Sequence, residues 1–474
     1  MALPIIKKIS DSTYSRRKVN MPKIIIGNGF SDAMVGDVSK NSLAVRRTAA
    51  VEARRLTWFV ENEDLIILPS PVSNELISYV NNIMRTQLSQ KNFIYTSQDP
   101  LEPKIITSEV LLSERMLSQL KTATQHTNNW QLFPYFYTSS IQTLADVLQN
   151  EAHHCPTFLT QSGADLLNQK AAFRAIYAHD VPIAKGAVCR NVHELYQQAK
   201  LLLSQTAKLI IKQNMNASGD GNILVSIDKN GPFAGIRDII FIDTSKDFTL
   251  NMAKQLWDML SDAHGNHQLV IEEYVTNQNT LYAEYNIKSD SSFEMLSYGI
   301  VRMEGSGDKR GNGIANWVGF EIPYKANVAP SFLNHCNQLA RTTGQLGFVG
   351  RINFDAIVCE DNQILFTEVN GRLGGCSHLA HVCQKILGKR FLDETTLITR
   401  NRVPIADFKQ VILLAEKLKQ LFRHSGIIIL NEDMACLRLM EYLVYAPTKA
   451  EACALEQQFL HQLTLIQERC KEII

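Results

Sequence analysis

Residues 350–375, with the sequence GRINFDAIVCEDNQILFTEVNGRLGG, constrain the fold more than any other part of the chain. Two apolar, β-rich runs flank an Asp-Asn dipeptide that suits a two-residue turn, so the segment predicts an antiparallel hairpin. Folding the hairpin at that turn places Asp355 directly opposite Glu368. Because side chains alternate between the faces of a strand, Asn370 and Arg372 are predicted to share the face of Glu368. One end of the hairpin is therefore expected to be polar and acidic.

Two carboxylates placed opposite each other repel by roughly 0.2–1 kcal/mol, unless a cation lies between them. Magnesium prefers hard oxygen ligands, commonly one or two protein carboxylates together with water and phosphate oxygens. Asp355, Glu368 and the amide oxygen of Asn370 supply such a set and are the predicted metal ligands. The alternative is a solvated hairpin face without a ligand, which the run from Glu368 to Gly375 disfavours.

A second segment offers donors for phosphate. The strands predicted at 208–212 and 223–227 flank the polar sequence QNMNASGDGN, which predicts a hairpin tip. Lys212 ends the first strand, and small residues in the tip would let backbone N–H groups approach phosphate closely. An ordinary turn has the same composition, so this prediction depends on Lys212 and on the acidic hairpin downstream. The predicted phosphate-binding residues here are Lys212, Ser218, Gly219 and Gly221.

Two further segments suggest how a nucleotide could be held. The run Glu272, Glu273, Tyr274 and Val275 is predicted to pass between lobes and to bind a base through its backbone. The glycine-rich segment 304–316 contains Lys309 and Arg310 and predicts a lid over the site, although a surface loop explains these charges equally well. Arg302 precedes it on a predicted strand and is the better candidate for a fixed phosphate contact.

The chain's 474 residues predict about three domains. Strands at 23–27, 65–68 and 93–96, with a helix at 74–88, predict an α/β domain over residues 1–161. A module over 162–402 is expected next, with a small lobe at 185–273 and a large lobe at 274–402. An α+β domain over 403–474 is expected last, with a helix at 408–422. The fold class is thus α/β and α+β.

Composition excludes several classes of protein. The chain has 48 basic and 47 acidic residues, so no global field favours nucleic acid or anionic membrane as a partner. Its nine cysteines contain no C-x-x-C pair, which predicts neither a zinc site nor a disulfide framework. No signal peptide or membrane span is evident, and a cytoplasmic location is expected. The cysteines, including Cys376, are expected to be packing residues.

Taken in order, Lys170, Lys212 with its glycine loop, the Glu-Glu-Tyr-Val run, Asp355 and the sequence EVNGRLGG resemble the ATP-grasp superfamily over residues 162–390. The resemblance implies that ATP binds between two lobes, with Lys170 and Lys212 on its phosphates. It implies Mg²⁺, usually two ions, on Asp355, Glu368 and Asn370, with Mn²⁺ as the expected substitute. Arg372 would stabilise the transferring phosphate and an acyl phosphate.

The opening IIIGNGFSDAMVGD and the sequence NGRLGG look more like the pheganomycin-type peptide ligases of that superfamily. This narrower resemblance implies a pre-ATP-grasp domain, an ATP-grasp module and a specific C-terminal domain. It also implies a ligase that joins a small-molecule carboxylate to an amino-acid or peptide amine through an acyl phosphate. An ATP-grasp kinase and a catalytically silent nucleotide-binding protein are the alternatives. The sequence assigns no role to Arg351 or Asn353, and it leaves open whether the protein is a homodimer, the commonest soluble assembly.

Overall fold

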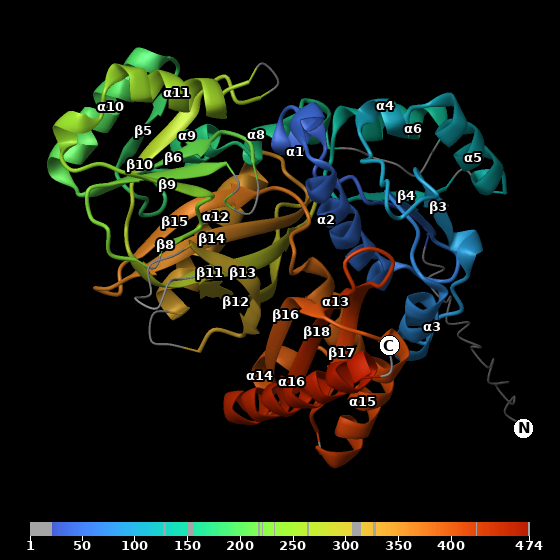
Figure 1. Cartoon of the computed structure of the whole chain (residues 1–474). Helices are drawn as coiled ribbons and strands as arrows, with labels where there is room; N and C mark the ends of the chain where they lie inside the picture. Colours follow the sequence, from blue (N-terminus) through green and yellow to red (C-terminus); the bar gives the residue numbers. More distant parts are fainter. Residues whose placement is uncertain are drawn as a thin grey trace, which may run out of the picture.

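The structure is a computed structural model of the chain. It describes residues 21–472 except 127–128, 150–155, 217–218, 220, 232, 263–264, 306–313, 326–328 and 423. The described strands form three sheets, which Figure 1 shows in blue to cyan, in green, and in yellow to red. No helix in the described part of the chain combines the length and the apolar character that crossing a membrane would require.

The first sheet has four parallel strands in the order β3-β2-β1-β4. The central strands β1 and β2 are almost entirely apolar because helices and other elements bury both faces of the sheet. Ile25 packs into one core, while Ile24 and Ile26 pack into another. The strands expected at 23–27, 65–68 and 93–96 are confirmed, as is the helix expected from Asn74. The elements are β1 (Lys23–Ile26), α1 (Asp32–Val35), α2 (Leu43–Ala53), β2 (Leu65–Leu68), α3 (Asn74–Met84), β3 (Phe93–Tyr95), α4 (Ser108–Leu111), α5 (Glu114–Thr124), β4 (Gln131–Pro134) and α6 (Ser139–Val147).

The second sheet has five strands in the order β5-β10-β6-β7-β9, with α10 and α11 packed on one face over a shared apolar core. Helix α10 begins where the Asn191 side chain accepts a hydrogen bond from the Glu194 N–H, at 2.9 Å. The hairpin predicted around the tip at 213–222 is confirmed, with Lys212 opposite Asn222. The elements are α7 (Thr157–Thr160), α8 (Gly163–Leu167), α9 (Lys170–Tyr177), β5 (Gly186–Cys189), α10 (Val192–Gln205), β6 (Lys208–Gln213), β7 (Asn222–Ser226), β9 (Asp238–Phe241), α11 (Leu250–Leu260) and β10 (Leu269–Glu273).

The third sheet runs β15-β14-β11-β12-β13-β16-β18-β17, and the short strand β8 pairs with β13. Strands after residue 395 join this sheet through only two residue pairs between β13 and β16, Glu321 with Ile398 and Ile322 with Leu397. The elements are β8 (Phe233–Ala234), β11 (Asn277–Ile287), β12 (Phe293–Gly305), β13 (Ile314–Ile322), α12 (Ala329–Gln345), β14 (Gly350–Cys359), β15 (Ile364–Asn370), α13 (Ser377–Leu387), α14 (Phe391–Glu394), β16 (Thr396–Pro404), α15 (Phe408–Leu421), β17 (Gly426–Asp433), β18 (Leu439–Ala446) and α16 (Lys449–Glu472).

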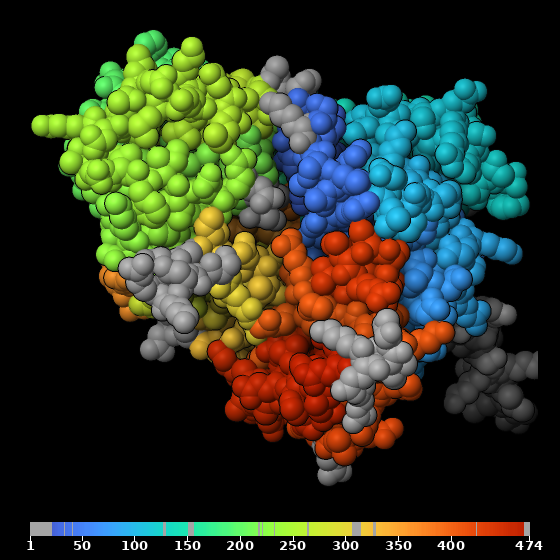
Figure 2. Space-filling view, in the orientation of Figure 1, coloured from blue at the N-terminus to red at the C-terminus, as the bar shows by residue number. Residues whose placement is uncertain are grey.

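The N-terminal and C-terminal parts of the chain share a hydrophobic core. Trp58 donates its indole N–H to the Leu430 carbonyl at 2.7 Å, and Arg54 donates to the Glu432 carbonyl at 3.0 Å. Figure 2 shows the orange and red C-terminal residues packed directly against the blue N-terminal ones. The N-terminal residues are thereby held beside the third sheet, where they line part of the cleft described next.

Candidate active site

The hairpin of β14 and β15 places Asp355 opposite Glu368, which confirms the predicted pairing. The turn is not the predicted two-residue turn: the Cys359 N–H donates to the Gln363 carbonyl, and the residues between include Asn362 at φ 66°. Thr367 is the extra residue of a β-bulge next to the pair, and its hydroxyl donates to the Asp355 carbonyl at 3.2 Å. The longer turn and the bulge offset each other, so the predicted pairing holds at Asp355.

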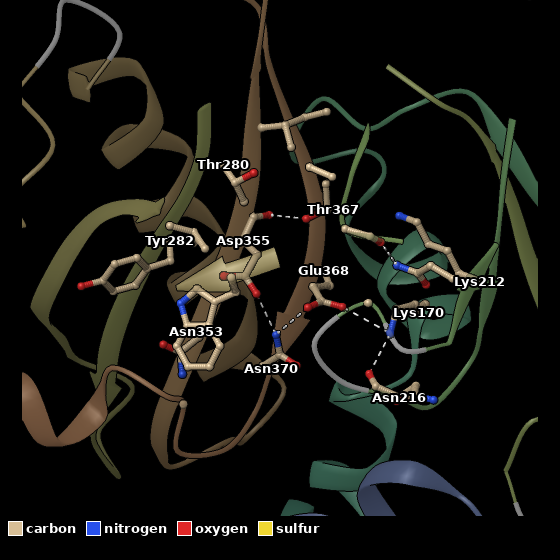
Figure 3. Close-up of a pocket in the computed structure, with 18 of the residues that line it drawn as sticks. Lys170, Lys212, Asn216, Thr280, Tyr282, Asn353, Asp355, Thr367, Glu368 and Asn370 are labelled. Carbon is tan, nitrogen blue, oxygen red and sulfur yellow. Dashed lines mark hydrogen bonds and ion pairs between the residues drawn. The ribbon is translucent and has the colours of Figure 1, made fainter. Parts of the chain in front are cut away.

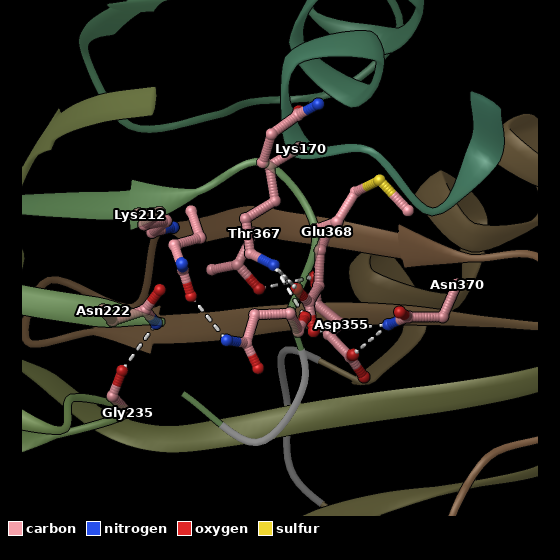
Figure 4. A network of polar contacts seen from close by, with 12 residues as sticks. Lys170, Lys212, Asn222, Gly235, Asp355, Thr367, Glu368 and Asn370 are labelled. Carbon is pink, nitrogen blue, oxygen red and sulfur yellow. Dashed lines mark hydrogen bonds and ion pairs between the residues drawn. The ribbon is translucent and has the colours of Figure 1, made fainter. Parts of the chain in front are cut away.

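The Asn370 amide links the two carboxylates. Its Nδ2 donates to Asp355 Oδ2 at 3.0 Å and to Glu368 Oε1 at 3.3 Å (Figure 3). Lys170, the first residue of α9, approaches from the other side of the cleft, with its Nζ 3.3 Å from Glu368 Oε2. Lys170 also donates to the Asn216 carbonyl at 3.0 Å (Figure 3), so its ammonium group bridges the hairpin and the second sheet. Figure 4 shows the same lysine beside Glu368.

Burial and neighbouring charges shift the pKa values of the two carboxylates in opposite directions. Burial and the neighbouring charge of Glu368 raise the pKa of Asp355 well above its ordinary value. Burial also opposes ionisation of Glu368, but Lys170, the Asn370 hydrogen bond and Arg372 more than offset it and lower its pKa to about 2. The pair is therefore short of positive charge on the Asp355 side, and a second cation there would let both groups ionise.

The donor set fits magnesium in chemistry and in number of carboxylates. Among the described residues, no cluster of three or more His, Cys, Asp or Glu side chains is placed to hold a metal ion, so the pair would need the Asn370 amide and non-protein ligands. Asn370 Oδ1 accepts from Arg372 Nη2 at 2.9 Å, while its Nδ2 faces the carboxylates. Ligation by Asn370 would thus require the amide to turn over.

Lys212, the second predicted phosphate ligand, lies near the end of β6 and reaches Glu272 on the neighbouring strand β10. Its Nζ is 2.5 Å from Glu272 Oε2, and Arg174 Nη1 is 2.8 Å from the other oxygen, Oε1. Arg174, which the sequence did not single out, thus shares the buried Glu272 carboxylate with Lys212. Because this acid already has two cations, one of them can turn to an anionic ligand without leaving Glu272 unpaired.

The rest of the predicted nucleotide-binding run lies along the same cleft. Glu273, Tyr274 and Val275 line it, but the N–H groups of Glu273 and Tyr274 donate to the carbonyls of Lys185 and Lys208. Those two N–H groups hold the strands together and are engaged within the protein. The Tyr274 hydroxyl accepts from the Ala234 N–H at 2.9 Å, which ties the run to β8.

The glycine loop meets the cleft at two positions. Gly219 has a φ of +78°, and an added Cβ there would lie 2.8 Å from the Gly235 carbonyl oxygen. At Gly221 an added Cβ would lie 2.5 Å from Gln213 Oε1. Both glycines line the cleft, so glycine is required by backbone conformation at the first and by space at both. Ser218 lies outside the described residues.

The structure separates the two predicted arginines. Arg372 lines the cleft, with its guanidinium carbon 6.0 Å from the centre of the Tyr135 ring. Arg302 lies on the opposite face of β12, because it stands between Val301 and Met303, which both line the cleft. Its guanidinium donates to both Glu456 oxygens, at 2.9 and 3.0 Å. The lid residues Lys309 and Arg310 lie outside the described part of the chain.

Arg351 and Asn353, to which the sequence assigned no role, support the segment after β15. Arg351 donates to the Ser377 carbonyl at 2.9 Å, and Asn353 donates to the Arg372 carbonyl at 3.2 Å. Ser377 in turn donates to Glu284 and accepts from the Gly374 N–H at 2.8 Å. These contacts hold the backbone that carries Arg372. All the cleft residues together surround a volume of about 320 Å³.

A family model described as the Pre ATP-grasp domain matches residues 53–149. No curated protein matches the chain at significant similarity. Among solved structures, a biotin carboxylase–beta-gamma-ATP complex from Campylobacter jejuni is 12% identical, covers 92% of this chain and 89% of its own, and has a TM-score of 0.53. An N5-carboxyaminoimidazole synthetase from Staphylococcus aureus is also 12% identical, with 94% and 98% covered and a TM-score of 0.52. At these identities the likeness shows the fold, and it confirms the predicted fold class.

Proposed function

We propose that this chain, which has an ATP-grasp fold with a pre-ATP-grasp domain, is an ATP- and magnesium-dependent ligase that joins a carboxylate to an amine. The observation that carries the proposal is the Asp355–Glu368 pair, linked by Asn370 and faced by Lys170 across one cleft. Such a site combines carboxylates for a divalent cation with fixed positive charge for phosphate.

The residues divide the work between binding and charge stabilisation. Lys170 and Lys212 would bind the phosphates of ATP, while Gly219 and Gly221 let the loop approach them. Glu272, Glu273, Tyr274 and Val275 would line the base. Asp355, Glu368 and Asn370 would hold magnesium, most simply as two ions, with Mn²⁺ able to substitute. When bound, magnesium neutralises charge that develops on the transferring phosphoryl group.

The reaction we propose begins when a substrate carboxylate attacks the γ-phosphorus of ATP and ADP leaves. Arg372 is placed to offset negative charge on the resulting acyl phosphate. An amine then attacks the acyl carbon, phosphate leaves, the amine nitrogen loses a proton, and an amide remains. Closing the cleft would keep water from the acyl phosphate.

Peptide or amino-acid substrates are supported by the resemblance to pheganomycin-type ligases. Its opening motif contributes Phe30 and Met34 to the cleft, and its NGRLGG sequence contributes Arg372, Gly374 and Gly375.

The test is to incubate the protein with ATP, magnesium and pooled amino acids or dipeptides, and to follow ADP, AMP and new condensed masses. The ligase proposal predicts that ADP forms only when the pooled amino acids or dipeptides are present. It also predicts a product whose mass is the sum of two substrates less one water. Formation of AMP would indicate adenylation instead, and a phosphorylated alcohol would indicate a kinase. A protein that binds ATP without either product would be a silent nucleotide-binding protein.

A further inference from the structure

Helix α9 begins with Lys170, at an end of the helix that is unfavourable for a lysine. The partial positive charge at a helix N-terminus disfavours a cation there. The Lys170 side chain is also only 8% exposed, and its ammonium group is held by Glu368 and by the Asn216 carbonyl. The helix gains no stability from this charge, so the place of Lys170 is better explained by the cleft that it lines.

Asn214 holds the first turn of α9. Gln169, the residue before the helix, makes no capping hydrogen bond with its side chain. Instead, the Asn214 carbonyl accepts from the Lys170 N–H at 3.0 Å, and Asn214 Oδ1 accepts from the Ala171 N–H at 3.0 Å. These N–H groups are among those that a helix leaves without partners at its start. A residue 43 positions after Ala171 therefore caps this helix.

The Asn214 amide is also fixed on its other side. Asn214 is fully buried, and its Nδ2 donates to Gln169 Oε1 and to the Gly265 carbonyl, both at 3.3 Å. The next N–H along the chain, that of Met215, donates to Oδ1 of the fully buried Asn266 at 2.7 Å. The backbone after β6 therefore cannot shift without breaking buried hydrogen bonds to two other segments.

The same stretch of backbone carries Lys212, the other lysine of the cleft. Strand β6 ends at Gln213, so Lys212 and Asn214 are separated by one residue. One turn further along α9, Arg174 shares the Glu272 carboxylate with Lys212. Helix α9 is thus tied to the second sheet at two points, by Asn214 at its first turn and by Arg174 at its second. Two ties fix both the position and the direction of the helix.

We propose that Asn214 is a positioning residue, which places the Lys170 ammonium group relative to that of Lys212 and so matches the two lysines to one triphosphate chain. Asn214 is not one of the residues that line the cleft, so it acts through Lys170 rather than on ATP. The inference rests on the proposed function, since it names the residue that aligns the phosphate-binding lysines. Such alignment lowers the cost of ordering the site when ATP binds.

The experiment measures, by calorimetry, the affinity of the full chain for a non-hydrolysable ATP analogue in the presence of magnesium. Asn214→Ala removes the side-chain cap of α9, and the affinity should fall about tenfold or more. The matched control is Thr343→Val. Thr343 is also fully buried, and its hydroxyl shares a 2.8 Å hydrogen bond with Tyr177, the last residue of α9.

The control should lose stability and keep wild-type affinity, because it loosens the end of α9 that lies away from Lys170. Wild-type affinity in a folded Asn214→Ala protein would overturn the inference. An equal loss of affinity in Thr343→Val would also overturn it, since any loosening of the helix would then have the same effect.

A double variant separates positioning from a general loss of structure. Lys170→Met alone should weaken the analogue about tenfold or more. Adding Asn214→Ala to Lys170→Met should weaken it by no more than about a further threefold, because the group that Asn214 positions has already been removed. Losses that multiply in full would show that Asn214 acts independently of Lys170 and would overturn the inference.

Gln169→Leu decides the question if Asn214→Ala does not fold. Gln169 is partly exposed, and this change removes only one acceptor of the Asn214 amide. The affinity for the analogue should fall about threefold in Gln169→Leu, and it should not fall further when Gln169→Leu is added to Lys170→Met. In that case, wild-type affinity of a folded Gln169→Leu protein would overturn the inference.

The wild-type titration separates the two proposals. Failure of the wild-type protein to bind the analogue would contradict the proposed function. Binding by wild type that Asn214→Ala leaves unchanged would overturn the inference about Asn214 and leave the proposed function standing.

Discussion

Asp355 and Glu368 face each other across β14 and β15, and a single Asn370 amide donates to both carboxylates. One carboxylate has Lys170 at 3.3 Å, and the other has its pKa raised by burial and by its neighbour. Without a metal ion, Glu368 therefore has a cation beside it and Asp355 does not have enough positive charge to ionise readily. A cation next to Asp355 would favour its ionised form. The first prediction follows from this asymmetry.

Asp355→Asn should stabilise the metal-free protein and abolish its response to magnesium and ATP. A carboxyl whose pKa is raised in the folded state stabilises the fold at low pH and loses that contribution as pH rises through the folded pKa. Removing the charge should thus raise the free energy of unfolding at neutral pH by about 1–2 kcal/mol. Thermal unfolding with and without magnesium and ATP measures both effects. A variant that is destabilised and still gains stability from magnesium and ATP would contradict the account.

Lys212→Met should raise the KM for ATP by about tenfold or more with little loss of stability. The fold should survive because Arg174 still pairs with Glu272 at 2.8 Å. Steady-state kinetics and thermal unfolding on the same preparation check both parts. The matched control is Lys229→Met, which removes an exposed lysine in the loop after β7 and should leave KM unchanged. A large loss of stability with an unchanged KM would show that Lys212 is structural.

The two arginines should behave in opposite ways. Arg302→Ala should lower the free energy of unfolding by about 2–4 kcal/mol, because it leaves the buried Glu456 carboxylate with fewer partners, and it should leave the KM for ATP unchanged. Arg372→Ala should lower kcat about a hundredfold or more with a smaller change in stability. Chemical unfolding measures the stability of both variants, and steady-state kinetics measure their kcat and their KM for ATP. A loss of kcat in Arg302→Ala and a loss of stability alone in Arg372→Ala would contradict these roles and would indicate that Arg302 belongs to the active site.

His381 on α13 should make the fold sensitive to acid. Its ring lies 5.0 Å from that of Phe59, and burial with the nearby Arg351 lowers its pKa from 6.5 to about 4. A histidine of lowered pKa contributes stability that is complete above pH 6.5 and is lost as pH falls toward 4. The loss amounts to at most about 3 kcal/mol, from the two pKa values and 1.36 kcal/mol per unit.

The measurement is urea unfolding at pH 7 and pH 4.5. Wild type should lose more stability between the two pH values than His381→Phe does. His193→Phe, at an exposed position on α10, is the control and should behave like wild type. Equal losses in wild type and His381→Phe would refute this role.

Local patterns in the sequence predicted the hairpin well, because strand pairing next to a turn depends on nearby residues. They could not reveal the β-bulge, in which Thr367 is an extra residue of β15. Nor could they reveal that the turn is one residue longer than predicted. The sequence also could not predict that Arg302 points away from the cleft. That depends on which face of β12 lines the cleft, and the cleft is formed by segments far apart in the sequence. The link from Arg174 to Glu272 joins residues that only the packing of α9 beside β10 brings together.

The C-terminal strands show the same limit on a larger scale. The apolar runs after residue 403 predict strands, but nothing in them indicates which sheet they join. The structure connects them through two residue pairs of β13 and β16 and through a core shared with Trp58. Such contacts join segments that lie far apart in the sequence, and they leave no local pattern.

The central claim, a magnesium and phosphate site on the hairpin, is tested most directly by magnesium-dependent formation of ADP in Glu368→Gln. The matched control is Glu360→Gln, an exposed acid at the turn of the same hairpin. With ATP, magnesium and an accepted carboxylate and amine, we predict that Glu368→Gln forms ADP at least about a hundredfold more slowly than wild type. Glu360→Gln should match wild type. Wild-type ADP formation by a folded Glu368→Gln protein would contradict the account.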